Sequence, residues 1–100
     1  MDKQTEIEVE AATFRRLLNH LDSHKEVQNI DLMILADFCR NCLAKWYLAE
    51  ADSRGESIDY DQARERIYGQ PYEEWKRQHQ TPATPEQLAA WEAHHKAKQK

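Results

Sequence analysis

The chain has 100 residues, of which 40% are hydrophobic and 32% charged, so it supplies the core of one domain rather than two. Its formal net charge of -4 argues against binding to nucleic acid, whose phosphate backbone is also negative. No stretch approaches the roughly 20 apolar residues that cross a membrane, and the N-terminus opens no signal peptide, so we expect a cytoplasmic protein without membrane association.

The composition favours an all-α fold. Only two glycines and three prolines occur, whereas the residue types that lose least on entering a helix are abundant. We therefore expect a small helical bundle of about five helices, which forms a single domain over residues 1–100.

The first helix is predicted from residue 5 to about residue 22. Its large apolar side chains recur near the helical period, and Arg15 and Arg16 fall on the other side. The apolar set is Ile7, Phe14, Leu17, Leu18 and Leu21. Residues 23–29 are polar and without period, which predicts a loop, and Asn29 or Asp31 can cap the helix that follows.

A long central helix is predicted over about residues 31–54, with Gly55 beyond its end in the left-handed position that glycine adopts most easily. Its apolar side chains cover more than half of the circumference, so neighbouring helices should enclose it. The remaining polar strip comprises Asp37, Asn41 and Lys45, with Arg40 at its border. This strip is the part of the central helix that we expect to be free to meet a partner.

Two short helices should follow, separated by Gly69. Asp59 and Gln62 have the spacing of a capping box, and Pro71 occupies a position that proline tolerates at a helix start. Three aromatic side chains are expected to cluster at the corner between these helices. They are Tyr68, Tyr72 and Trp75.

A C-terminal helix is predicted over about residues 85–98. Thr84 and Gln87 repeat the capping signature at its start. We expect this helix to be loosely attached, because Leu88 and Trp91 are its only large apolar side chains.

The central helix carries Cys39-Arg40-Asn41-Cys42, a Cys-x-x-Cys spacing that serves thiol exchange or metal binding elsewhere. In a continuous helix, Cys39 lies about two turns from the start, where the helix dipole stabilises a thiolate little. Both sulfurs would then point into the apolar arc, and a disulfide inside a helix would be strained. Packing in the core is the favoured interpretation, with metal ligation and redox exchange as the alternatives.

Zinc binding by the two cysteines would need two further ligands. His20 and His24 lie four residues apart on the first predicted helix and could supply two imidazoles. However, zinc sites of this composition usually place their cysteines on tight turns, and a surface position explains both histidines more simply. No cofactor is expected otherwise.

The sequence gives no support for an enzyme, and no catalytic residue is predicted. It contains no glycine-rich phosphate loop, nucleophile elbow or dinucleotide fingerprint. A small-ligand pocket edged by Arg40, Asn41 and Tyr68 is a further hypothesis, although these residues more simply fasten the aromatic corner to the central helix.

Two stretches resemble a known family. The first reads Val-Gln-Asn-Ile-Asp-Leu-Met at 27–33 and continues as Phe-Cys-Arg-Asn-Cys-Leu-Ala-Lys-Trp-Tyr at 38–47, and the second reads Tyr-Gly-Gln-Pro-Tyr-Glu-Glu-Trp-Lys at 68–76. Over about residues 14–86 the chain is similar to the short proteobacterial proteins grouped as domain-of-unknown-function family twelve forty-four. The resemblance implies an all-helical fold and a bacterial cytosolic setting, and it supplies no activity and no catalytic residue.

The favoured functional hypothesis is a non-enzymatic helical module that binds a protein partner or a second copy of itself. Its three tryptophans and four tyrosines exceed what a small core needs, and such residues dominate interface energetics. The predicted interaction surface comprises Asp37, Arg40, Asn41, Lys45, Tyr68, Tyr72, Trp75 and Trp91. The alternative is a zinc-binding or thiol-dependent protein that uses Cys39 and Cys42.

Overall fold

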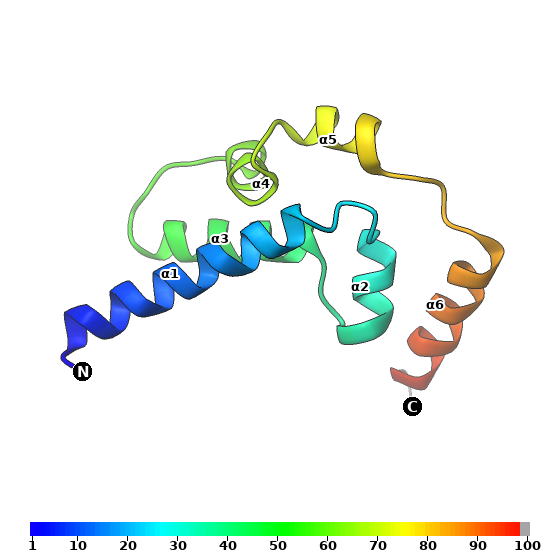
Figure 1. The fold of residues 1–100 in the computed structure, drawn as a ribbon, viewed down its shortest axis with the longest axis horizontal. Coiled ribbons are helices and arrows are strands. Elements are labelled where there is room, and N and C mark those ends of the chain that lie inside the picture. The colour runs from blue at the N-terminus through cyan, green and yellow to red at the C-terminus, as the bar shows by residue number, and fades with distance from the viewer. Residues whose placement is uncertain (99–100) are drawn as a thin grey trace.

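The computed structural model describes residues 1–98, and these residues form six helices and no strand (Figure 1). The helices are α1 (Lys3–Asp22), α2 (Asn29–Ala36), α3 (Arg40–Ser53), α4 (Tyr60–Tyr68), α5 (Tyr72–His79) and α6 (Pro85–Lys98). The predicted all-α class is confirmed. Among residues 1–98, no helix has both the length and the apolar character needed to cross a membrane.

Side-chain caps set several of the helix boundaries, as the sequence predicted. At the start of α4, Gln62 N donates to Asp59 Oδ1 at 2.8 Å, and Asp59 N donates to Gln62 Oε1 at 2.9 Å. At the start of α6, Gln87 N donates to Thr84 Oγ1 at 3.1 Å, and Thr84 N donates to Gln87 Oε1 at 2.8 Å. Each pair satisfies amide groups that a helix start leaves without a partner.

The predicted central helix over residues 31–54 is wrong, because the chain breaks into α2 and α3. Asp37 has a left-handed backbone with φ 60° and ψ 25°, and its N–H donates to Met33 O at 3.0 Å to close the last turn of α2. Aspartate is among the few residue types that adopt this conformation readily. Cys39 then has an extended backbone and forms the N-cap of α3. As Figure 1 shows, α2 and α3 consequently run in different directions.

The buried core lies mainly between α3 and α4, with α5 and the C-terminal half of α1 packed beside them. Ala44 of α3 and Ala63 of α4 have no solvent exposure, and their small side chains allow the two helices to approach closely. The buried core cluster consists of Leu18, Leu43, Ala44, Ala63, Ile67, Tyr68 and Trp75.

Two segments extend away from this core. The first is the N-terminal half of α1, in which every side chain from residue 3 to residue 10 is exposed. The second is α6, which packs on α2 and contains no buried residue (Figure 1). The radius of gyration is 15.7 Å, whereas a compact domain of this length has about 13 Å. A single copy therefore leaves much of its helical surface uncovered.

Candidate functional site

Three sulfur atoms gather where α2 ends and α3 begins. Cys39 Sγ lies 3.7 Å from Cys42 Sγ, and Cys42 Sγ lies 4.0 Å from Met33 Sδ. Both cysteines are free thiols. Cys39 is buried, whereas Cys42 and Met33 are half-buried, so solvent reaches one side of the group. We call these three residues the sulfur cluster.

The break at Asp37 changes the position of the cysteine pair in its helix. The predicted position of Cys39, about two turns inside a helix, is wrong because Cys39 is the N-cap of α3. The first turn of α3 contains no acidic residue, so no carboxylate of that turn offsets the positive end of the helix dipole. The cysteine pair therefore lies at a helix start, where the dipole can stabilise a thiolate.

Burial and the helix start act in opposite directions on Cys39. Burial raises the pKa of the Cys39 thiol, and the backbone N–H groups of Cys42 and Asn41 lower it by a smaller amount. Burial is the larger effect, so Cys39 holds its proton at neutral pH. A group that replaces this proton has to stabilise the anionic sulfur itself.

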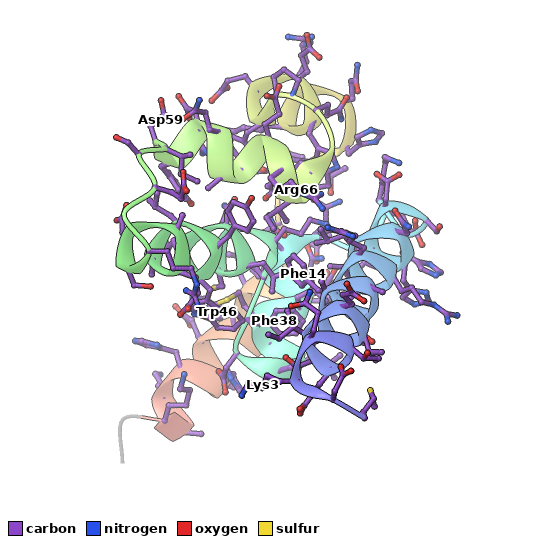
Figure 2. All side chains as sticks on the ribbon, turned by 90° about the vertical axis from the view of Figure 1, so that its left-hand side faces the viewer. Lys3, Phe14, Phe38, Trp46, Asp59 and Arg66 are labelled. Carbon is purple, nitrogen blue, oxygen red and sulfur yellow. The ribbon has the colours of Figure 1, made fainter. Side chains whose placement is uncertain are left out.

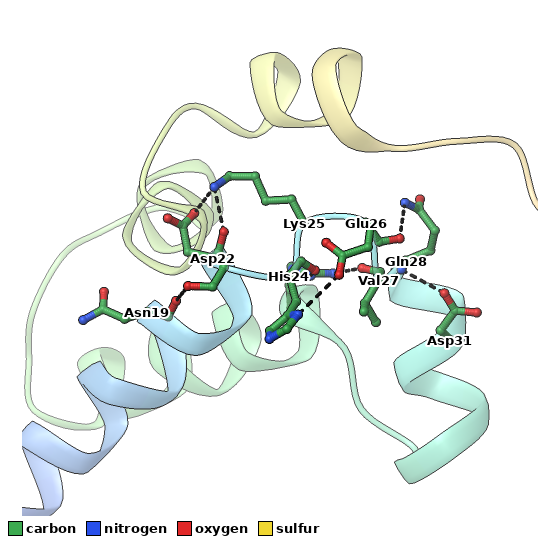
Figure 3. A network of polar contacts seen from close by, with 10 residues as sticks. Asn19, Asp22, His24, Lys25, Glu26, Val27, Gln28 and Asp31 are labelled. Atoms are coloured by element: carbon green, nitrogen blue, oxygen red, sulfur yellow. Dashed lines mark hydrogen bonds and ion pairs between the residues drawn. The ribbon is translucent and has the colours of Figure 1, made fainter.

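The structure does not assemble the predicted zinc ligands. Among residues 1–98, no group of three or more His, Cys, Asp or Glu side chains lies close enough together to hold a metal ion. The rings of His20 and His24 lie next to each other, with 4.7 Å between their centroids. His24 Nδ1 is 3.3 Å from Glu26 Oε1, within the loop that Figure 3 shows. The two histidines thus meet each other without joining the cysteines.

Arg40 is an interior residue and not the border of an exposed strip. Its side chain is buried, with 3% exposure, and lies over the ring of Trp75 at 5.0 Å. Nη1 donates to Val27 O at 2.8 Å and to Asn29 Oδ1 at 3.1 Å, and Nη2 donates to His24 O at 3.1 Å. Burial lowers the pKa of the guanidinium. Arg40 therefore fastens the loop between α1 and α2 to the start of α3.

Tyr68 joins the same polar network from α4. Its hydroxyl donates to Asn41 Oδ1 at 2.7 Å and accepts from Asn29 Nδ2 at 3.1 Å. Burial raises the pKa of the hydroxyl, so Tyr68 stays neutral. Trp75 packs edge-on against Tyr68 and is 2% exposed. Placing Arg40, Tyr68 and Trp75 on an interaction surface was wrong, because all three side chains are buried.

The other residues of the predicted interaction surface lie apart from one another. Asp37 is exposed at the end of α2, where His94 Nε2 and Lys98 Nζ of α6 contact its Oδ1 atom. These hydrogen bonds lower the pKa of Asp37. Lys45 is exposed on α3, while Asn41 is half-buried. The break between α2 and α3 interrupts the continuous strip that the sequence predicted.

The two remaining aromatic residues of the predicted surface are half-buried. Tyr72 lies beside Arg64, whose guanidinium carbon is 4.2 Å from the centroid of the tyrosine ring. Trp91 of α6 stacks with His95, at 5.6 Å between ring centroids. Each aromatic ring therefore has one face occupied by a neighbour within this chain.

Gln28 connects two loops of the fold, a role that the sequence did not predict. It is buried, and its side chain donates to His79 O at 3.0 Å and accepts from Thr81 N at 2.9 Å. Its backbone N–H donates to Asp31 Oδ2 at 2.9 Å, as Figure 3 shows. Gln28 thus ties the loop after α1 to the end of α5, and a lone glutamine in a polar loop gives little signal of this role.

Exposed apolar side chains on several helices are another feature that the sequence did not indicate. Ile7 and Leu17 belong to the apolar set predicted for the first helix, yet both are exposed. In Figure 2, Lys3 at the start of α1 lies far from Arg66 of α4, and Trp46 projects from the side of α3 that faces away from α4. The large exposed apolar residues are Met1, Ile7, Val9, Leu17, Leu35, Trp46, Tyr47 and Leu88.

The length of α1 contains a signal for this exposure. Its 20 residues extend about 30 Å, whereas the 9 residues of α4, against which it packs, extend about 14 Å. A helix twice as long as its neighbour leaves part of its apolar side without cover. The lengths of both helices were available from the sequence, but the packing of α1 on α4 was not.

The family comparison covers most of the chain. A family model described as "Protein of unknown function (DUF1244)" matches residues 27–93. The matched span contains the sulfur cluster and the Arg40 network, and it begins after α1. No curated protein matches the chain.

Proposed function

The chain belongs to the DUF1244 family of unknown function. We propose that it is a non-enzymatic helical module whose α1 pairs with α1 of a second copy. The observation that supports this proposal is the exposed N-terminal half of α1. Half a helix without tertiary contacts is marginally stable by itself, since packing supplies most helical stability in proteins. A second copy would supply that packing.

The apolar side of α1 continues beyond the core of its own chain. Ile7, Phe14 and Leu21 are spaced by seven residues, so they lie on one side of the helix, about two turns apart. Phe14 and Leu21 pack against the core, whereas Ile7 is 48% exposed. Leu17, three residues after Phe14, is also exposed on this side. Two apolar side chains are thus available to a partner, one on each side of Ala12.

The arrangement of these side chains suits a two-fold antiparallel pair. In such a dimer the same surface meets itself, so a contact between two different residues occurs twice. Centring the pair near Ala12 places Ile7 of one copy opposite Leu17 of the other.

The charges of α1 favour the same orientation. The first half of the helix is acidic, with Glu6, Glu8 and Glu10, whereas Arg15 and Arg16 make the second half basic. An antiparallel pair brings each acidic half beside the basic half of the other copy, and a parallel pair brings like charges together. Complementary charge of this kind selects the orientation of an interface more than it adds affinity.

Sedimentation of two matched variants tests the proposal. Ile7 and Val9 have nearly equal exposure, 48% and 47%, but they lie two residues apart and therefore on different sides of α1. We expect wild-type protein and Val9→Glu to sediment as dimers and Ile7→Glu to sediment as a monomer with unchanged helical content. A wild-type protein that stays monomeric at high concentration, or an Ile7→Glu protein that dimerises like Val9→Glu, would contradict the proposal.

Charge reversal tests the orientation separately. Arg15→Glu with Arg16→Glu should weaken the dimer, and adding Glu8→Lys with Glu10→Lys should restore it, because the halves then carry opposite charges again. A parallel pair or an uncharged contact predicts no restoration. Raising the salt concentration should weaken the wild-type dimer only moderately, since apolar contacts remain.

A further inference from the structure

The sulfur cluster has the donor atoms and spacing of a metal site with fewer ligands than zinc requires. Its members come from two helices, with Met33 on α2 and the cysteine pair at the start of α3. Thiolate and thioether sulfurs are soft ligands that suit Cu(I), zinc and iron–sulfur clusters rather than hard cations. In the continuous helix that the sequence predicts, residues 33 and 42 lie about 14 Å apart along the axis, so Met33 was not expected beside the cysteines.

Two of the three distances between the sulfur atoms match those around a shared metal ion. With metal–sulfur bonds of about 2.3 Å, two sulfurs on one ion lie about 3.8 Å apart in a tetrahedral site and about 4.0 Å apart in a trigonal site. The observed separations are 3.7 Å between the two thiols and 4.0 Å between Cys42 Sγ and Met33 Sδ. Both pairs can therefore bridge one ion with only small movements.

The ligand set distinguishes the metals that use cysteine. Structural zinc takes four ligands, usually Cys and His, and no third residue of these types or of Asp and Glu joins the two cysteines among residues 1–98. Cu(I) is satisfied by about two or three soft ligands. We propose that Cys39, Cys42 and Met33 form a binding site for one Cu(I) ion.

Binding at this site releases protons and adds negative charge. Two S–H bonds break as two Cu–S bonds form, and both protons pass to solvent, while copper keeps its oxidation state. Two thiolates and one Cu(I) ion carry a net charge of one negative unit, and the Met33 thioether is neutral. The N-terminal end of α3 lies at this charge, with Arg40 as the first residue of the helix and no acid in the first turn.

The ion has a route to the site from solvent. Cys42 and Met33 are half-buried, whereas Cys39 lies behind them with 8% exposure. An incoming Cu(I) complex would therefore meet the more exposed residues, Cys42 and Met33, first and exchange its carrier ligand for Cys39 last. A site closed on one side and open on the other is suited to transfer of the ion between ligands.

Competition with a chromophoric Cu(I) chelator tests the proposal on the reduced full-length protein without oxygen. Wild-type protein should remove one Cu(I) per chain from bathocuproine disulfonate, and the loaded protein should resist thiol alkylation. Cys39→Ser and Cys42→Ser should each lose this transfer. Met33→Leu preserves size and apolar character without the thioether, and it should bind Cu(I) about tenfold more weakly.

Several results would overturn the assignment. Wild-type protein that leaves the chelator complex intact would remove the site, and unchanged binding by Met33→Leu would remove Met33 from it. Tighter binding of Zn(II) than of Cu(I), measured with a zinc indicator, would contradict the choice of metal. Circular dichroism of each variant separates loss of ligand from loss of fold, and Ile7→Glu should bind Cu(I) like wild type, because this site does not depend on dimerisation.

Discussion

Helices α3, α4 and α5 surround the buried core. The outer helices α1 and α6 have few buried side chains. In the core, Trp75 is 2% exposed and packs beside Tyr68 and Arg40, whereas Trp46 on the outer side of α3 is 56% exposed. In α6, side-chain hydrogen bonds to α2 hold a helix that has no buried residue. Buried side chains are therefore concentrated between α3, α4 and α5, whereas α6 and the outer side of α3 stay uncovered.

The largest expected difference in unfolding free energy is between alanine substitutions of Trp75 and Trp46. Trp75→Ala removes a fully buried ring and leaves a cavity, which should lower the free energy of unfolding by about 3–5 kcal/mol. Trp46→Ala removes an exposed ring, and its effect on the monomer should stay within about 0.5 kcal/mol. Urea unfolding at low protein concentration measures both variants. Equal losses would show that the core and the outer surface do not differ in this way.

Arg40 should give the next largest effect. Arg40→Met keeps most of the volume but leaves the carbonyl oxygens of His24 and Val27 without a donor, which should cost about 2–4 kcal/mol. Arg54→Met is the matched control, because Arg54 is exposed and its ion pair with Glu50 contributes little. Urea unfolding decides between them, and an Arg40→Met protein as stable as the control would remove the structural role of this guanidinium.

Tyr68 tests a single hydrogen-bonding group within the core. Tyr68→Phe removes the hydroxyl that joins Asn29 to Asn41, so the unfolding free energy should fall by about 1–2 kcal/mol with little change in packing. Tyr47→Phe, on the exposed side of α3, should have no measurable effect. A neutral Tyr68→Phe variant would show that the asparagine side chains find other partners.

The smallest expected effect concerns attachment of α6. Because hydrogen bonds from His94 and Lys98 lower the pKa of Asp37, the contact is stabilising above the pKa of the unfolded chain and is lost as pH falls through the lower folded pKa. Protection of α6 amides, measured relative to α4, should therefore fall below about pH 4. Asp37→Asn keeps a residue that tolerates the left-handed backbone, and it should remove this pH dependence. Asp52→Asn serves as the control, and the same pH dependence in Asp37→Asn would contradict the assignment.

Much of the fold followed from local chemistry that the sequence displays. The capping pairs Asp59 with Gln62 and Thr84 with Gln87 are both present, and Gly69 ends α4 with a φ of 78°. These features depend on residues within a few positions of one another. Local rules therefore place the helix ends well in this chain.

The break at Asp37 could not be predicted in the same way. Residues 31–54 have helix-forming composition throughout, and an aspartate is also common in exposed helical positions, so no local signal separates α2 from α3. The break depends on contacts made at long range, such as the hydrogen bonds from Arg40 to the loop after α1. The sulfur cluster was missed for this reason, because Met33 approaches Cys42 only when the chain turns.

The exposed N-terminal half of α1 is the direct test of self-association. Hydrogen exchange of the amides of residues 6–10 should be slow at high protein concentration and fast after dilution, because a second copy covers this segment only in the dimer. Ile7→Glu should exchange rapidly at both concentrations, and Val9→Glu should behave like wild type. Exchange of these amides that does not change with concentration in the wild-type protein would contradict pairing through α1.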